Sequence, residues 1–149
     1  MSEAASGRRE AGCPLCAGGG EAVLWRDAFC RVILADDDRY PGFCRVILNA
    51  HVGEMTDLAP DERQRLMAVV FAVESALREL LEPDKINLAS LGNIVPHLHW
   101  HVIPRYADDA HYPDAVWAAP RRDAMPRSVP DDLSSRLARL LQARLLQAG

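Results

Sequence analysis

The sequence predicts an α+β domain with an antiparallel sheet of about five strands, one long helix between the two halves of the sheet, and a C-terminal helix. Two β-rich runs with the same letters, FCRVIL, lie at 29–34 and 43–48. Apolar residues at steps of three and four then predict a helix over 60–81. Residues 95–106 return to the two-residue period of a strand, which completes the mixed pattern.

Length and composition favour one domain. The chain has 149 residues, of which 49% are hydrophobic, and this is enough for one core but too little for two. We expect a disordered leader over residues 1–12 and a single domain over 13–149. Within that domain, residues 13–106 form the core and residues 107–149 form an extension that ends in the last helix.

Charge and hydropathy argue against several classes of protein. The formal charge of -4 argues against a nucleic-acid partner, because surfaces that bind nucleic acid are normally basic. No apolar run approaches the roughly 18 residues that span a bilayer. The N-terminus also lacks the apolar segment of a secretory signal, so we expect a cytoplasmic protein with no membrane partner.

The elements of the core follow one another along the chain. CPLCAGGGE, at 13–21, predicts a compact loop, and the turn-rich ADDDRYPG joins the two FCRVIL runs into a hairpin. The long helix begins at Pro60, has two acidic residues at its positive N-terminal end, and stops before Pro83. INLASL, at 86–91, predicts the strand that precedes the histidine-rich segment.

The extension has two parts. Residues 107–130 are punctuated by prolines and show few regular signals, so we expect them to wrap over the surface or to line a site. After Pro130 the leucines recur at helical spacing, and two aspartates occupy the first turn. These residues predict an amphipathic helix whose apolar stripe packs on the domain.

The stretch VPHLHWHVIPRY places His97, His99 and His101 at every second residue. In a strand alternate side chains share one face, so we expect the three imidazoles to form a row while the apolar residues between them face a core. Pro96 and Pro104 suit the two ends of such a strand. The imidazoles repel one another when protonated, so at least one should be neutral near pH 7. Nucleophilic or acid–base catalysis, a catalytic metal site and a structural role all fit this row.

These motifs resemble those of the histidine triad (HIT) superfamily of nucleotide hydrolases and transferases. HLHWHVIP is similar to its His-x-His-x-His motif, PGFCRVILNAH resembles its upstream strand, and GNIVPH stands where the family has Gly-Gln-Ser/Thr-Val-x-His. The resemblance runs from about Cys13 to Tyr106 and follows the predicted order of strands and helix. It implies a HIT-like fold, a small nucleotide substrate and a homodimer.

The resemblance also implies a covalent mechanism at an α-phosphate. His99 would attack phosphorus, expel the leaving group and form a nucleotidyl-imidazole that water then cleaves. His101 would orient or protonate groups near the phosphate, and His97 would fix its neighbour's tautomer or serve elsewhere. In the family a backbone carbonyl typically holds the nucleophilic histidine, and no metal is needed to activate it.

Three further residues are candidates for nucleotide binding by the same resemblance. Asp36 would bind ribose hydroxyls, Asn87 occupies about the place of a polar strand residue near the nucleotide, and Asn93 stands in for the family's glutamine. Phe43 and Ile94 depart from the family pattern, because they replace a histidine and a hydroxyl residue that contacts phosphate. We therefore expect fewer or rearranged phosphate contacts.

Cys13 and Cys16 form a Cys-x-x-Cys pair, which alone fits zinc, redox chemistry or chance. A closed tetrahedral zinc site needs two further ligands, and the chain offers His51 and His97. Some histidine triad proteins and the related uridylyltransferases are similar in pairing these positions. A zinc ion here would be structural, and an empty reduced pair is the alternative.

The resemblance favours a hydrolase of nucleoside phosphoramidates or dinucleoside polyphosphates, or a nucleotidyl transferase. Two alternatives stay open. One is a zinc-dependent hydrolase that uses the histidine row as a catalytic metal site. The other is a nucleotide-binding module without activity, and Phe43 and Ile94 keep this alternative open.

Overall fold

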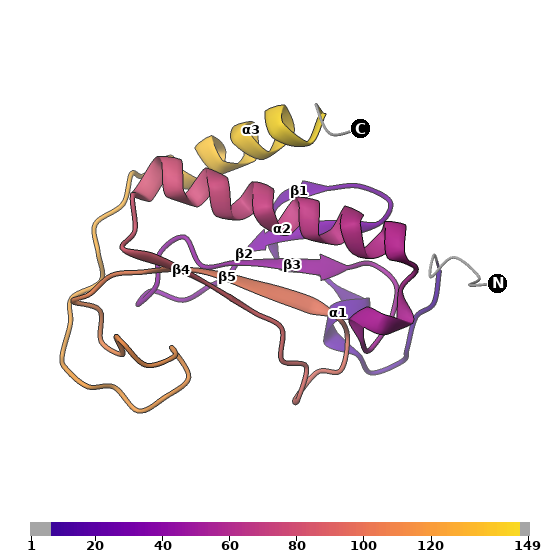
Figure 1. The fold of residues 1–149 in the computed structure, drawn as a ribbon, viewed down its shortest axis with the longest axis horizontal. Coiled ribbons are helices and arrows are strands. Elements are labelled where there is room, and N and C mark those ends of the chain that lie inside the picture. The colour runs from indigo at the N-terminus through magenta and orange to yellow at the C-terminus, as the bar shows by residue number, and fades with distance from the viewer. Residues whose placement is uncertain (1–6, 147–149) are drawn as a thin grey trace.

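Five strands form one antiparallel sheet in the order β1-β2-β3-β5-β4 (Figure 1). The structure is a computed structural model that describes residues 7–146. The strands are β1 (Ala22–Arg26), β2 (Cys30–Leu34), β3 (Cys44–Leu48), β4 (Lys85–Ala89) and β5 (His99–Arg105). The helices are α1 (Pro14–Ala17), the short 3-10 helix η1 (Met55–Asp57), α2 (Pro60–Leu81) and α3 (Leu133–Leu146). The α+β class and the antiparallel sheet are therefore confirmed.

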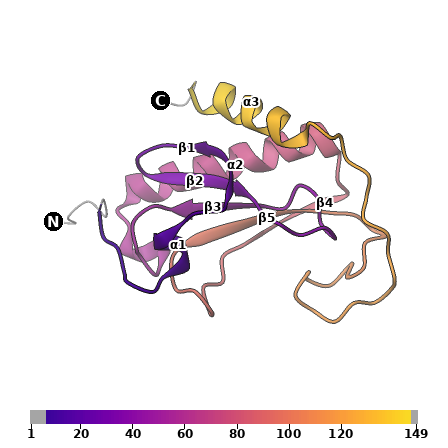
Figure 2. The same ribbon diagram turned by 180° about the vertical axis from the view of Figure 1, so that it is seen from behind.

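The two long helices, α2 and α3, cover one face of the sheet. Figures 1 and 2 show α2 lying along that face, with α3 beside it. The core between them takes alternate residues of the strands together with the apolar stripes of both helices. Val46 and Val102 come from the middle of the sheet, Leu77 comes from α2 and Leu137 from α3, and all four are fully buried. The other face carries the histidines.

The ends of α2 follow from local chemistry. The helix begins with Pro60 in its first turn, and the backbone N–H of Ala59 donates to the Glu62 carboxylate at 2.9 Å. It ends at Glu82, whose φ of 47° is left-handed, directly before Pro83. The sequence predicts both ends.

The histidine strand differs from its predicted limits. β5 begins at His99, so His97 lies in the loop before it, and the strand continues through Pro104 to Arg105. Pro104 pairs with Ile86 of β4, but the ladder with β3 already ends at Val102. The missing N–H of the proline therefore costs no hydrogen bond with β3, which explains why a proline is accepted inside this strand.

Two elements lie where the sequence analysis places no strand or helix. β1 precedes the FCRVIL hairpin and pairs with β2, and α1 occupies part of the stretch expected as a compact loop. Of the leader expected over 1–12, residues 1–6 lie outside the described residues, whereas Arg8 accepts a backbone hydrogen bond from His51 at 2.7 Å. None of the helices within residues 7–146 has the length and apolar character that crossing a membrane requires.

Candidate functional site

Cys13, Cys16, His51 and His97 come together at the N-terminal end of α1. Their ligand atoms all lie within 4.8 Å of one another. The Cys16 sulfur is 3.4 Å from Nδ1 of His51 and 3.4 Å from Nδ1 of His97, and the Cys13 sulfur is also 3.4 Å from Nδ1 of His97. The structure thus assembles the four ligands predicted from separate segments.

The second nitrogen of each imidazole in this cluster has its own partner. Nε2 of His97 lies 2.5 Å from the Leu48 carbonyl oxygen, and Nε2 of His51 lies 2.6 Å from the Glu10 carboxylate. Such contacts place the proton on Nε2 and direct the Nδ1 lone pair at a metal. Two thiols and two imidazoles oriented in this way fit zinc, which prefers four such ligands in structural sites.

His99 is held in one tautomer. Its Nδ1 lies 2.6 Å from the backbone carbonyl oxygen of His97, so Nδ1 carries the proton and donates, and Nε2 keeps its lone pair. The ring lines a groove of about 280 Å³ whose walls include Gly53, Ser90 and Gly92. A larger hollow of about 800 Å³ beside β2 does not include His99. Nε2 of His99 therefore keeps a free lone pair on a ring that lines an open groove.

His101 is buried and neutral. Its side chain packs edge-on against Phe43, His99 and Trp117, with ring centroids 5.7, 5.0 and 5.0 Å away. Burial, followed by the nearby His99 and Arg45, lowers the pKa of His101 to about 4. Its Nδ1 is buried and has no partner among the described residues. Because the imidazole stays neutral at pH 7, one of its nitrogens is available to a ligand.

The three candidates for nucleotide binding lie apart from this cluster. Asp36 is exposed just beyond β2, and Asn93 is exposed in the connection between β4 and β5. The amide oxygen of Asn87 accepts a hydrogen bond from Arg105 at 2.8 Å. No hydrogen bond or ion pair in the described part of the chain joins them to His99, so their role stays a prediction.

Some residues of the site were missed by the sequence analysis. Glu10 was placed in the leader but holds His51, and Arg45 was not singled out although its Cα pairs with that of His101. Trp117 lies in the segment 107–130, which was expected to wrap over the surface or to line a site, and its ring lies against His101. The alternation of Arg45 with buried Cys44 and Val46 was a signal that it lies on the open face.

The model of the HIT domain family matches residues 20–108, more than half of the chain. The chain belongs to the HIT domain family. Over 78 residues it is 30% identical to an AP-4-A phosphorylase of Mycobacterium tuberculosis, a match that covers 48% of this chain and 40% of that protein. It is 27% identical over 104 residues to a Bis(5'-nucleosyl)-tetraphosphatase [asymmetrical] of Schizosaccharomyces pombe, covering 66% of this chain and 57% of that protein. The chain thus spans about half the length of the curated relatives it matches.

Solved structures extend the likeness of this HIT domain over most of the chain. A histidine triad protein from Marinobacter aquaeolei VT8 is similar with a TM-score of 0.69 and 28% identity, covering 96% of this chain and 100% of that chain. A Zn-bound histidine triad family protein from Mycobacterium smegmatis is similar with a TM-score of 0.60 and 25% identity, covering 92% of this chain and 95% of that chain. These two likenesses include the residues beyond Tyr106 that no sequence motif covered.

Proposed function

We propose that this HIT domain is a nucleotide hydrolase or nucleotidyl transferase that acts at an α-phosphate through a covalent intermediate on His99. One observation carries the proposal: the hydrogen bond from Nδ1 of His99 to the carbonyl of His97 leaves Nε2 unprotonated at an open groove. A neutral imidazole with a fixed tautomer is a competent nucleophile near pH 7. The two relatives named for nucleotide phosphate chemistry support the same class.

In the proposed reaction Nε2 of His99 forms a bond to the α-phosphorus, and the bond from phosphorus to the leaving oxygen or nitrogen breaks. The electron pair goes to the leaving group, which takes up a proton. Water, or a second acceptor in a transferase, then attacks phosphorus and releases His99. His101, neutral and beside His99, would orient the phosphate or protonate a group near it, and general acid–base catalysis contributes about 10²–10⁴ in rate.

A zinc ion held by Cys13, Cys16, His51 and His97 would have a structural role. It would cross-link α1 to the loops after β3 and before β5, in addition to the backbone hydrogen bond from Leu98 to the Val52 carbonyl at 2.8 Å that already joins the two loops. His97 would connect this cross-link to the nucleophile, because its backbone carbonyl accepts the hydrogen bond from His99. The zinc-bound relative from Mycobacterium smegmatis supports this assignment.

The contacts of the histidines support the covalent route over a catalytic metal on the row. Nδ1 of His97 faces the two cysteines, while Nδ1 of His99 is used by a carbonyl, so these rings do not point at one common atom. Candidate substrates are nucleoside phosphoramidates and dinucleoside polyphosphates, with Asp36, Asn87 and Asn93 as nucleotide contacts. The cytoplasmic location and the homodimer stay predictions.

The test measures turnover of adenosine 5′-phosphoramidate and diadenosine tetraphosphate by the wild-type protein and His99→Ala, each with and without EDTA. We expect the variant to lose at least about a hundredfold in rate and wild-type activity to persist in EDTA while circular dichroism shows the fold intact. Intact mass should detect a nucleotidyl adduct on the wild-type protein alone. Equal rates for the two proteins would contradict the nucleophile assignment.

A further inference from the structure

Arg45 is a half-buried cation on the open face of the sheet. Its guanidinium carbon lies 5.5 Å from the Phe43 ring centroid, and its Nε is buried without a hydrogen-bond partner in the described chain. Within residues 7–146 the other arginines either bind a carboxylate or a backbone carbonyl, or are exposed to solvent. Burying part of a charge without an anion costs free energy, which an anionic ligand would offset.

Trp117 lies directly against His101. Its ring centroid is 5.0 Å from that of His101, with 68° between the planes, and 50% of the residue is exposed. It belongs to the segment between β5 and α3. An exposed indole next to His101, the neighbour of the proposed nucleophile His99, offers a face on which a planar ring can stack.

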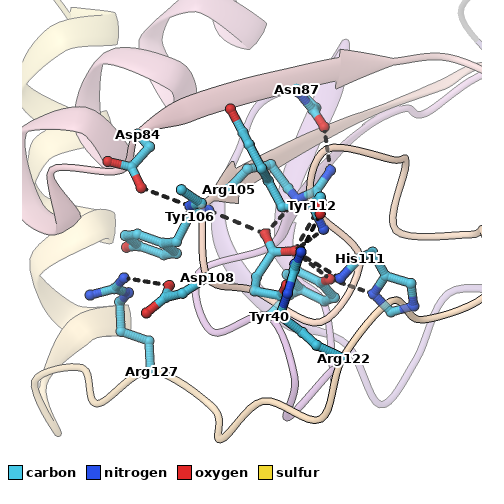
Figure 3. Close-up of polar contacts among 12 residues, drawn as sticks. Tyr40, Asp84, Asn87, Arg105, Tyr106, Asp108, His111, Tyr112, Arg122 and Arg127 are labelled. Carbon is cyan, nitrogen blue, oxygen red and sulfur yellow. Dashed lines mark hydrogen bonds and ion pairs between the residues drawn. The ribbon is translucent and has the colours of Figure 1, made fainter.

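The segment that carries Trp117 is fixed to the sheet. Arg105 is 1% exposed and binds the Asp109 carboxylate through two hydrogen bonds, of 2.8 and 3.0 Å. Figure 3 shows Arg105 reaching Asn87 of β4 on one side, with Tyr112 and Arg122 of the segment beside it. Arg122 donates to the backbone carbonyls of Asp109 and Tyr112 at 2.5 and 2.9 Å. Trp117 therefore has a defined position and is not part of a loose loop.

The pairing of β3 with β5 fixes where Arg45 lies relative to His99 and His101. In the antiparallel pair of β3 and β5, Ile47 faces His99, and Arg45 faces His101. The guanidinium extends towards Phe43, the residue directly before β3, and so away from His99 and the cysteine cluster. Arg45 and Trp117 thus lie beyond the nucleophile, on the side of His101.

We propose that Arg45 and Trp117 bind the leaving group, and that they favour a leaving group with phosphates and a planar base, as in a dinucleoside polyphosphate, over an amine. This inference rests on the proposed function. When Nε2 of His99 bonds to the α-phosphorus, the bridging P–O bond breaks and its electron pair stays on the departing phosphate oxygen. The guanidinium of Arg45 would stabilise that charge, while the base of the departing nucleotide stacks on Trp117.

The experiment compares kcat/KM for diadenosine tetraphosphate with kcat/KM for adenosine 5′-phosphoramidate. The variants are Arg45→Met and Arg45→Lys, Trp117→Ala and Trp117→Phe. We expect Arg45→Met and Trp117→Ala each to lower the ratio of kcat/KM for diadenosine tetraphosphate to kcat/KM for adenosine 5′-phosphoramidate by about tenfold. The loss of one charged contact or one stacked base has an effect of about this size. The Lys and Phe variants should recover part of the ratio.

Arg139→Met is the matched control, because Arg139 is exposed on α3, which packs on the opposite face of the sheet. An equal fall for both substrates would overturn the inference, since the pair would then hold the transferred nucleotide. An unchanged ratio would also overturn it.

Failure of the proposed function would show separately, as a wild-type protein that turns over neither substrate. Calorimetry with a methylene-bridged diadenosine tetraphosphate and with AMP then tests the inference by affinity alone. Arg45→Met and Trp117→Ala should lower the affinity for the dinucleotide by about tenfold more than they lower the affinity for AMP. Equal weakening of the two ligands, or none, would contradict it.

Discussion

His101 is a neutral imidazole because of where it lies. Burial against Phe43 and Trp117 lowers its pKa to about 4, well below the usual value for histidine. We expect its ring signals in NMR to stay those of a neutral imidazole from pH 8 to about pH 5. A titration midpoint near the ordinary value of about 6.5 would contradict this.

The same shift makes stability depend on pH. Between about pH 6.5 and 4 the unfolded chain binds a proton that folded His101 does not bind, so the free energy of unfolding falls as the pH falls through this window. The full effect is about 3 kcal/mol. Urea unfolding of the wild-type protein and His101→Gln at several pH values isolates the contribution of His101. Both proteins keep the cysteine and histidine cluster, so any pH dependence that comes from the cluster is common to the two.

Gly42 combines two constraints at one residue. Its φ is +90°, and an added Cβ would lie 2.6 Å from Cδ1 of Leu81 on α2. Gly19 has a similar φ of +95° with nothing within 4 Å of the added atom. We expect Gly19→Ala to lower the free energy of unfolding by about 1–2 kcal/mol through backbone strain alone, and Gly42→Ala to lower it by about 1 kcal/mol more. Equal losses in urea unfolding would show that Leu81 moves aside freely.

At the scale of elements, periodicity explains which parts of the fold the sequence predicts. α2 has six buried residues on one stripe, and its predicted limits are confirmed. β1 has no buried residue, and its sequence AVLWR does not alternate between apolar and polar residues, so no strand period marks it. α1 has four residues, too few for a helical period, and lies where its Cys16 contacts His51 and His97.

The segment after β5 depends on Asp109. Burial alone would raise the pKa of this carboxyl, but hydrogen bonds from Arg105 and from backbone N–H groups hold it well below its usual range. We expect Asp109→Asn to lower the free energy of unfolding by about 3–5 kcal/mol, because it leaves the Arg105 charge buried without its anion. Hydrogen exchange should show lost protection over residues 106–122.

Asp114→Asn is the control for that prediction. Asp114 binds Arg121 at 2.7 Å in the same segment, but both side chains are exposed, so the loss should be at most about 1 kcal/mol. Similar losses for the two aspartate variants would contradict the special role of the Arg105–Asp109 pair.

At the scale of the whole molecule, one core joins the sheet to both long helices. Leu137 of α3 is fully buried in the same cluster as Val70 of α2 and Val32 of β2. We expect Leu137→Ala to lower the free energy of unfolding by about 2–5 kcal/mol while unfolding stays a single transition. Leu146→Ala, on the same helix but 70% exposed, should change it by less than about 0.5 kcal/mol. Separate transitions by near- and far-ultraviolet circular dichroism would contradict a common core.

The sequence predicts those parts of the candidate site that form local motifs. The row at 97–101 and the cysteine pair are recognisable in the sequence, because their spacing is local. Arg45 becomes part of the site only through the register of β3 with β5, and Trp117 only through the return of its segment over the open face. Neither relation leaves a local pattern in the sequence, so both needed the three-dimensional structure.

The central pair of strands has a consequence for how the protein folds. α2 and β4 lie between β3 and β5 along the chain, so Arg45 and His101 are brought together by one of the long loop closures of the chain. Contacts of this kind slow folding and belong to its last cooperative step. During refolding, the activity proposed for His99 should therefore return with the slowest structural phase.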